Sequence, residues 1–317
     1  MKTRVALVKG SNRAGNIRQA LKLIENEIDL TGKSRVLVKV NFVSTTNSLA
    51  ATHVDAVKPL LAFLRQRYDG KITIGEAAAD RPAAEGFRTF GYLDLPHEFG
   101  VDLVDLNEGG WVPVKVYDSS LRPITLRYSR LVAESDYRIV IGPAKTHNVV
   151  VTTLSIKNLA MGALYCKPNA DMSIPAVESD KHLMHQGHAV HNLNLYLLNR
   201  AYAPDLSIID GFVGMDGDGP IDGQPVDWKV AVASRDPVAA DCLASHLMGF
   251  PLTDIGYLWY CSKKGLGTGD LNQMEILGER TSDCRCNFKP PPDYEVQKRW
   301  RDERVATLLG LKSNAQL

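Results

Sequence analysis

The sequence predicts an α/β fold with a mostly parallel sheet flanked by helices, and three observations support this. Runs rich in β-branched residues alternate with helical patterns, as in RVALVKG, NIRQALKLIENEI, RVLVKVNFV, HVDAVKPLLAFLRQRY and KITIGEAA (residues 4–78). The run YRIVIGPAK (137–145) is nearly continuous in apolar residues, which is typical of a strand that is covered on both faces. WKVAVAS (228–234) and DPVAADCLASHLMG (236–249) then repeat the order of strand and helix. Such alternation is typical of βαβ units in a parallel sheet.

The organisation along the chain predicts two lobes and a C-terminal extension. Residues 1–204 form the expected N-terminal α/β lobe, which carries a lysine and histidine site. A small antiparallel excursion is expected near 101–128, where VDLVDLN, WVPVKVYD and PITLRYS are separated only by turn-like breaks. Residues 205–283 form the expected C-terminal α/β lobe with an Asp/Gly-rich loop. The proline-rich stretch CNFKPPPDY predicts that 284–317 is a linker followed by a terminal helix.

Composition and charge exclude several functional classes. The chain has 37 basic and 36 acidic residues among 317, so its net charge of +1 argues against nucleic acid or a membrane surface as a partner. The N-terminal apolar run covers only Val5 to Val8, too short for a signal peptide or a membrane span, and we expect a cytoplasmic protein. The five cysteines contain no CxxC pair, which argues against a disulfide framework or a zinc or iron–sulfur motif. The sequence leaves open whether the protein forms a homodimer.

The segment KTHNVVVTTLSIKNLAMG (145–162) places three basic side chains among apolar and small residues. Lys145 and His147 are two residues apart at the carboxyl end of an expected strand, so we expect them to point to the same side. Lys157 shares a helix face with apolar residues, so its ammonium group either reaches an edge or is partly desolvated. Desolvation would lower its pKa and make it a base or a nucleophile. His147, Lys157 and Lys145 are therefore the candidate catalytic residues.

The helix expected over 152–164 offers a place for an anion at its first turn. Free N–H groups at a helix start, together with the hydroxyl of Thr152 and its neighbours, can hold a negative charge. Asn158 stands beside Lys157 and adds an amide. We therefore expect Lys157, Asn158 and Thr152 to bind a cofactor or a small anionic molecule.

An acidic, glycine-rich loop follows the strand expected over 205–215. Asp210, Asp216 and Asp218 lie at the carboxyl end of that strand, where open α/β sheets place their sites, and they are further candidates for cofactor binding. A plain turn and a metal-binding or substrate-facing loop both stay open for GMDGDG (214–219). Its glycine spacing and its aspartates do not suit a dinucleotide, because the carboxylates would repel a pyrophosphate.

Histidines gather in HLMHQGHAVH, at positions 182, 185, 188 and 191. On one straight helix these residues would spread around half the circumference, so they cannot all bind one metal ion. Gly187 predicts a break, with His182 and His185 before it and the other two on the following helix. Imidazoles suit zinc, nickel or iron, so His185 and His182 are the candidate metal ligands.

The motifs VLVKVNFV, ATH, SDYRIVIGPAKTH, LSIKNLAMG, DGFVGMDGDGP and ASRDPVAADCLASHLMG, taken in this order, resemble the domain-of-unknown-function family 362. The resemblance covers roughly residues 35–250. Some members of that family carry an added ferredoxin-like cluster module, whose cysteines this chain lacks.

The segment from the strand through His147 to Lys157 also resembles, remotely, the nickel-pincer lactate racemase family. That resemblance implies that Lys157 carries a pincer nucleotide, that His147 is catalytic and that His185 binds the metal. The racemases have a glycine-rich, arginine-containing run before their lysine, whereas this chain has VVVTTLSI.

These observations predict an enzyme that acts on a small anionic substrate by a racemase, epimerase or isomerase type of reaction, or by a related proton or hydride shift. The enzyme class is therefore an isomerase or an oxidoreductase. A divalent metal (nickel, zinc or iron) or a nickel-pincer-type nucleotide is the expected cofactor. The alternative is a non-catalytic metal-binding or electron-transfer accessory protein that uses the histidines.

Overall fold

The computed structural model describes residues 2–167 and 178–311, and its centre is one ten-stranded sheet. Eight strands follow one another in the order β14-β1-β13-β11-β7-β2-β3-β4, while β12 pairs with β11 and β8 pairs with β7. Their bounds are Thr3–Lys9 (β1), Val36–Lys39 (β2), Ile72–Glu76 (β3), Asp102–Asp105 (β4), Tyr137–His147 (β7), Val151–Thr153 (β8), Leu206–Asp216 (β11), Gln224–Val226 (β12), Val230–Ser234 (β13) and Met274–Gly278 (β14). Along the eight-strand path only β13 runs antiparallel to its neighbours. The predicted α/β fold with a mostly parallel sheet is therefore confirmed.

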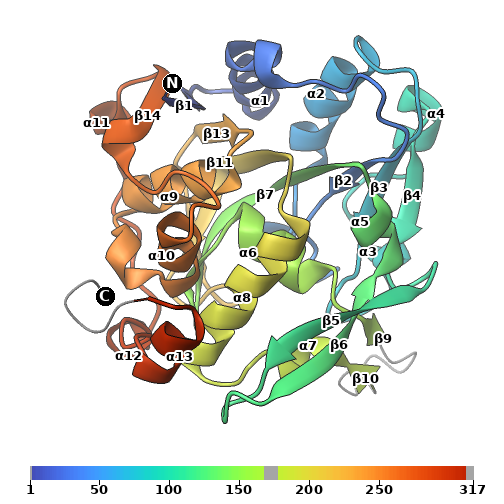
Figure 1. The fold of residues 1–317 in the computed structure, drawn as a ribbon. Helices are drawn as coiled ribbons and strands as arrows, with labels where there is room; N and C mark the ends of the chain where they lie inside the picture. The colour runs from blue at the N-terminus through green and yellow to red at the C-terminus, as the bar shows by residue number, and fades with distance from the viewer. Residues whose placement is uncertain (1, 168–177, 312–317) are drawn as a thin grey trace.

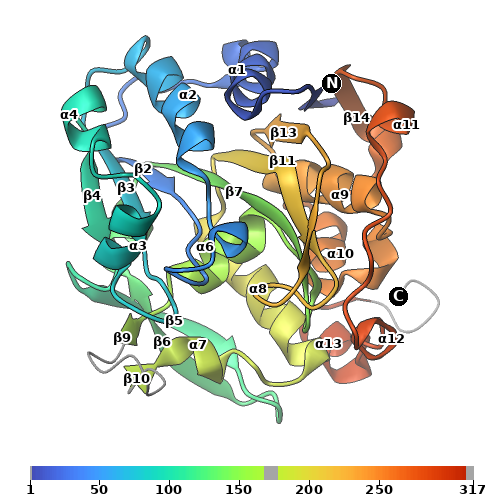
Figure 2. The ribbon, with the colours of Figure 1, turned by 180° about the vertical axis from the view of Figure 1, so that it is seen from behind.

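Helices cover both faces of this sheet, as the two opposite views show (Figure 1, Figure 2). One face carries α6 (Ser155–Gly162), α8 (His188–Tyr202), α9 (Pro237–Met248) and α10 (Gly256–Lys263). The other face carries α1 (Arg13–Leu23) and α2 (Val54–Arg65), with α3 (Ala83–Thr89) and α4 (Leu95–Phe99) near the β4 edge. Each face has its own apolar core, because successive strand residues point to opposite sides: Val5 and Leu7 join the α9 side, and Ala6 and Val8 join the α1 side.

Two small antiparallel sheets lie outside the main sheet. β5 (Trp111–Tyr117) pairs with β6 (Pro123–Ser129), and β9 (Cys166–Lys167) pairs with β10 (Glu178–Ser179). The excursion predicted near 101–128 is confirmed for β5 and β6, but its first segment was placed wrongly. β4 joins the main sheet parallel to β3, because the short helices α3 and α4 provide the crossover that a parallel pair needs.

The division into two lobes stays a prediction, while the C-terminal extension contains short helices. Strand β11 pairs with β7 across the expected boundary at residue 204, so any division into lobes has to cut one continuous sheet. After α11 (Thr281–Cys284), the expected terminal helix is two short helices, α12 (Tyr294–Gln297) and α13 (Glu303–Leu308). The chain breaks between them because Trp300 is buried in the core and the Asp302 carboxylate accepts from the Arg304 N–H to start a new helix.

Candidate functional site

A cavity of about 260 Å³ lies where β2, β3 and β7 end and α6 begins. Its polar lining comes from Asn41, Glu76, His147, Asn148, Thr153, Lys157, Asn158, Ser179, Lys181, His182 and His185, and its apolar lining includes Phe42, Val43, Ala77, Ala79 and Met161. The carboxyl ends of parallel strands meet at one edge of a sheet, which is where such folds place their sites. The cavity thus brings together five of the residues expected from the sequence: His147, Lys157, Asn158, His182 and His185.

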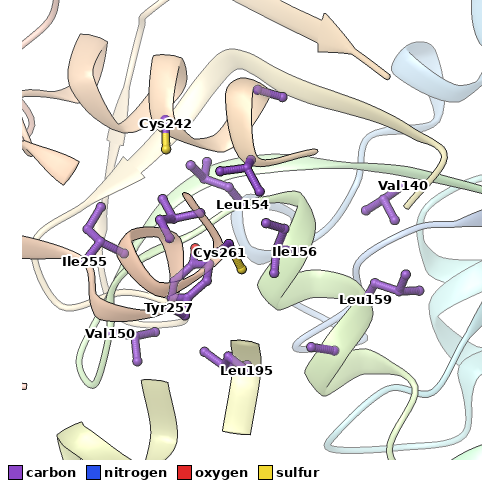
Figure 3. Packing of buried hydrophobic residues seen from close by; sticks show 14 of the residues in the cluster. Val140, Val150, Leu154, Ile156, Leu159, Leu195, Cys242, Ile255, Tyr257 and Cys261 are labelled. Carbon is purple, nitrogen blue, oxygen red and sulfur yellow. The ribbon is translucent and has the colours of Figure 1, made fainter. Parts of the chain in front are cut away.

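Helix α6 places Lys157 in this cavity, and a carboxylate from another helix holds its first turn. Asp241 of α9 accepts hydrogen bonds from the backbone N–H groups of Ser155 (3.0 Å) and Ile156 (2.9 Å) and from the Ser155 hydroxyl. Burial raises the pKa of Asp241 to about 7. On its packed side, Ile156 and Leu159 lie among buried side chains of α8 and α10, including Leu195 and Tyr257 (Figure 3). The orientation of Lys157 is thus fixed by packing and by a buried carboxylate.

The same geometry corrects the sequence-based prediction of an anion site at the helix start. Helix α6 begins at Ser155 rather than at residue 152, because the β-branched residues before it form strand β8 against the end of β7. Its first free N–H groups bind Asp241, so they are not available to a ligand. Thr152 lies within this buried layer, with its hydroxyl 3.3 Å from that of Ser245, and it does not line the cavity.

Replacing Asp241 with alanine should lower the free energy of unfolding by about 1–2 kcal/mol, because two buried N–H groups of α6 lose their acceptor. Urea unfolding at neutral pH measures the change. The matched control is Asp227→Ala, which removes an exposed ion pair with Lys229 and should cost less than about 1 kcal/mol. Equal effects of the two substitutions would show that Asp241 does not hold the helix start.

Lys157 is buried, with 6% of its surface exposed, yet it has no hydrogen-bond acceptor or ion-pair partner among the residues that the structure describes. Glu76 is the one carboxylate among the described lining residues. Its oxygens accept from Lys39 Nζ (2.8 Å) and from the N–H groups of Ala77 (2.8 Å) and Phe42 (2.6 Å). Burial, with a smaller contribution from nearby Lys181, lowers the pKa of Lys157 to about 7. Near neutral pH this amine is therefore charged in only part of the molecules.

Two further lysines are buried beside the cavity. Lys145 does not line it: its ammonium group donates to Asn41 Oδ1 (2.6 Å) and to the Ala50 carbonyl (2.8 Å). Burial, followed by the charge of Lys157, lowers its pKa to about 7. Lys39 donates to Glu76 and, at 3.1 Å, to Asn158 Oδ1, and Asn41 also donates to that oxygen at 3.2 Å. A connected polar network thus supports the floor of the site.

Four residues of the site and its surroundings were not predicted from the sequence: Lys39, Asn41, Glu76 and Lys181. The signal for the first two was present in VLVKVNFV, where polar side chains alternate with valines at a strand end. Glu76 likewise ends the strand ITIGE. Polar residues at the carboxyl ends of neighbouring parallel strands are expected to converge. Lys181 gave no comparable signal, because its position on the short helix α7 (Asp180–Leu183) depends on tertiary structure.

The cavity histidines His147 and His185 are held as opposite tautomers of the neutral ring. His147 Nδ1 accepts from the Val149 N–H at 2.9 Å, so its proton is on Nε2 in the neutral ring. His185 Nδ1 lies 3.1 Å from the Lys181 carbonyl, which can only accept, so its proton is on Nδ1 and Nε2 keeps a lone pair. Burial lowers the pKa of both rings, and the charge of Lys157 lowers it further. One ring therefore offers a donor and the other an acceptor.

Gly187 breaks the histidine-rich segment as predicted. It has a φ of 86° and stands directly before α8, which carries His188 and His191. His191 is fully buried, and its ring lies 4.8 Å from that of His185. No group of three or more His, Cys, Asp or Glu side chains in residues 2–167 and 178–311 could hold a metal ion. His185 and His182 thus share the cavity with Lys157, but without a third ligand of this kind.

The three aspartates expected at the site lie elsewhere. Asp210 is buried against Arg13 Nε at 3.0 Å, and burial raises its pKa. Asp216 accepts from the Lys289 N–H at 2.8 Å, and Asp218 borders a separate hollow beside the proline-rich segment. Only Pro220 of this loop lines the cavity. Asp216 and Asp218 are kept away because their part of the loop lies against residues 289–292, which the sequence pattern did not indicate.

Two known proteins are similar to this chain. It is 27% identical over 245 residues to a "Thylakoid-associated protein" of Synechocystis sp., covering 75% of this chain and 72% of that protein. The apoprotein of lactate racemase from Thermoanaerobacterium thermosaccharolyticum matches with a TM-score of 0.46 and 13% identity over 78% of this chain. The match covers 57% of the racemase chain.

No helix in the described parts of the chain is both long and apolar enough to cross a membrane.

The family model described as "Domain of unknown function (DUF362)" matches residues 36–246, which is more than half of the chain. The chain therefore belongs to the DUF362 family.

Proposed function

We propose that the protein is an enzyme that binds a small carboxylate in this cavity and catalyses a proton shift on it, as racemases, epimerases and isomerases do. The observation that carries this proposal is the ammonium group of Lys157, which faces the cavity while the one lining carboxylate among the described residues is already engaged. A buried positive charge without a partner is costly, so a site of this kind favours an anionic ligand.

The size of the cavity supports a small substrate. Its volume of about 260 Å³ lies below the range of about 300–1,000 Å³ that is typical of pockets for drug-sized ligands. A molecule of a few carbon atoms suits this space better than a nucleotide does. The pincer nucleotide implied by the racemase resemblance therefore does not fit the described cavity well, and the proposed chemistry uses only residues of the chain.

The lining supplies the groups that a proton shift needs. Lys181 donates one hydrogen bond to the Ala77 carbonyl, which leaves donors of its ammonium group for a substrate carboxylate. His147 Nε2–H can donate to a substrate oxygen and stabilise negative charge that develops there. His185 is exposed at the cavity, and its Nε2 lone pair can accept a proton from carbon or oxygen. The alternative, a metal carrier, is not supported by any group of three or more His, Cys, Asp or Glu side chains that could hold a metal ion in the described residues.

Exchange of substrate protons with D₂O tests the proposal without knowledge of the product. The protein is incubated in D₂O with a panel of small 2-hydroxy and 2-oxo carboxylates. ¹H NMR then follows the loss of the signal of the protons bound to the carbon that exchanges. We expect exchange with at least one member. His185→Gln should slow it at least about 100-fold and His147→Gln at least about 10-fold, as for positioned acid–base groups.

Lys71→Gln is the control, because it removes an exposed lysine that pairs with Asp102 at the amino ends of β3 and β4, whereas the cavity lies at the carboxyl end of β3. It should leave the exchange rate unchanged. Binding of the same carboxylates, followed by saturation-transfer NMR, provides the second measurement, and Lys157→Gln should weaken it at least about 10-fold. If no member of the panel binds and none exchanges its protons, the proposed function is refuted.

A further inference from the structure

The surroundings of Lys157 are those of a nucleophilic amine. Its side chain enters a cavity whose lining includes Phe42, Val43 and Met161, and such surroundings desolvate the ammonium form. The neighbouring cation of Lys181 disfavours the charged form further. Desolvation and a second cationic group are the two conditions that activate lysine for covalent catalysis. Simple electrostatic binding of an anion would require neither condition.

Resting on the proposed function and narrowing its substrate class, we propose that Lys157 forms a Schiff base with the carbonyl carbon of a small 2-oxo carboxylate. The Nζ lone pair attacks the carbonyl carbon and forms a C–N bond, the π bond of the carbonyl group breaks, and the first amine proton passes to the oxygen to give a hydroxyl group. Loss of that oxygen as water, with the second amine proton, leaves the C=N bond. One proton from solvent then gives the iminium ion. No electrons are gained or lost, and no further reactant is needed.

The other cavity groups suit this reaction. His147 Nε2–H can donate to the carbonyl oxygen while it becomes a hydroxyl group and leaves as water. Lys181 can hold the carboxylate, because its ammonium group uses one donor on the Ala77 carbonyl. An iminium ion acidifies the protons on the adjacent carbon, and His185 Nε2 is the uncharged base beside it. Capture by Lys157 therefore prepares the proton shift of the proposed function.

The other lysines around the site are engaged. Lys145 donates to Asn41 and to the Ala50 carbonyl and does not line the cavity. Lys39 donates to Glu76, to Asn158 and to the Val40 carbonyl. Lys181 lines the cavity but is bonded to the Ala77 carbonyl. These amines would have to break hydrogen bonds before they could attack, so the proposal predicts modification of one site.

Reductive trapping tests this proposal on the whole protein. Pyruvate is the probe, because it is a small 2-oxo carboxylate, and sodium cyanoborohydride reduces any imine to a stable secondary amine. Intact mass counts the adducts, and peptide mapping locates them. We expect a single adduct on Lys157, formed at least about 10-fold faster than on any other lysine. The rate should rise between pH 6 and pH 8, because the pKa of Lys157 lies at about 7.

Controls separate this inference from the proposed function. Lys157→Arg carries a positive charge but lacks a nucleophilic amine at this pH, so it should still bind propionate and give no adduct. Propionate, which has no carbonyl carbon next to its carboxylate, should protect Lys157 from trapping. Propionate binding without a Lys157 adduct would overturn the Schiff base and leave the proposed function standing. Adducts spread over many lysines at similar rates would also overturn it, whereas absence of both binding and trapping would overturn both proposals.

Discussion

Replacing Glu76 with alanine is expected to lower the free energy of unfolding by about 3–5 kcal/mol, the largest effect of any single substitution considered at the site. Glu76 forms an ion pair of 2.8 Å with Lys39, and both side chains are almost fully buried. Its second oxygen accepts from the Phe42 N–H. Without the carboxylate, the buried ammonium group of Lys39 loses its ion-pair partner, and two backbone N–H groups lose their acceptor. Urea unfolding with detection by circular dichroism measures the loss.

Two comparisons make this expectation specific. Glu275→Ala removes an ion pair with Arg4 in which both side chains are about half exposed, and it should cost less than about 1 kcal/mol. Lys39→Met combined with Glu76→Gln removes both charges and should recover part of the loss, because no unpaired charge stays buried. A Glu76→Ala protein as stable as the Glu275→Ala protein would contradict the buried pair.

Replacing Lys157 with methionine is expected to stabilise the protein at neutral and acidic pH. A pKa lowered from 10.5 to about 7 corresponds to a cost of at most about 5 kcal/mol for keeping the ammonium form in the folded state. Solvent in the cavity reduces this cost, so we expect a gain of about 1–3 kcal/mol at pH 6.5. Function would be lost in exchange, since the substitution removes the amine on which both proposals depend.

The gain should depend on pH in one direction. Between pH 7 and pH 10.5 the unfolded chain binds a proton at Lys157 that the folded chain releases, so the parent becomes more stable as pH rises. Below pH 7 both states carry the proton and the full cost is present. The advantage of Lys157→Met should therefore be largest below pH 7 and shrink toward zero near pH 10.5. Urea unfolding of both proteins at pH 6.5, 8 and 9.5 follows the trend.

Lys22→Met is the matched control, because Lys22 is an exposed lysine of α1 that pairs with Glu25. Its stability should stay within about 0.5 kcal/mol of the parent. A Lys157→Met protein that is less stable than the parent at pH 6.5, or whose advantage does not change with pH, would show that this amine is not desolvated.

Much of the site was predictable from local pattern. Strand ends are marked by a change from apolar to polar residues, so Lys145 and His147 could be placed at the carboxyl end of β7. The helical spacing after them placed Lys157 on a packed helix. The ends of α9 also follow local signals, because Asp236 is its N-cap, Pro237 its first residue and Gly249 its C-cap. These features depend on near neighbours in the chain, which is why one sequence suffices to predict them.

Other assignments failed because they depend on distant contacts. Thr152 was expected on the helix that carries Lys157, but pairing with the end of β7 makes it part of a strand. Asp216 and Asp218 follow a strand end as site residues do, yet contacts with residues 289–292 draw their loop away from the cavity. Glu76 and Lys39 were overlooked, although each ends a strand and the two strands are neighbours, because the sequence pattern does not show that their side chains form an ion pair.

By itself, the sequence determined the α/β class, the alternation of strands and helices and the break at Gly187. It also determined the two segments, 145–162 and 182–191, that supply basic side chains to the cavity. These features follow from periodicity and backbone preferences, which act over a few residues. Only the tertiary structure decided that Asp241 occupies the start of α6, that Glu76 is engaged by Lys39 and that Lys157 is left with no acceptor among the described residues. Charge balance in a buried site depends on which strands lie side by side, and that order is fixed by packing of the whole sheet.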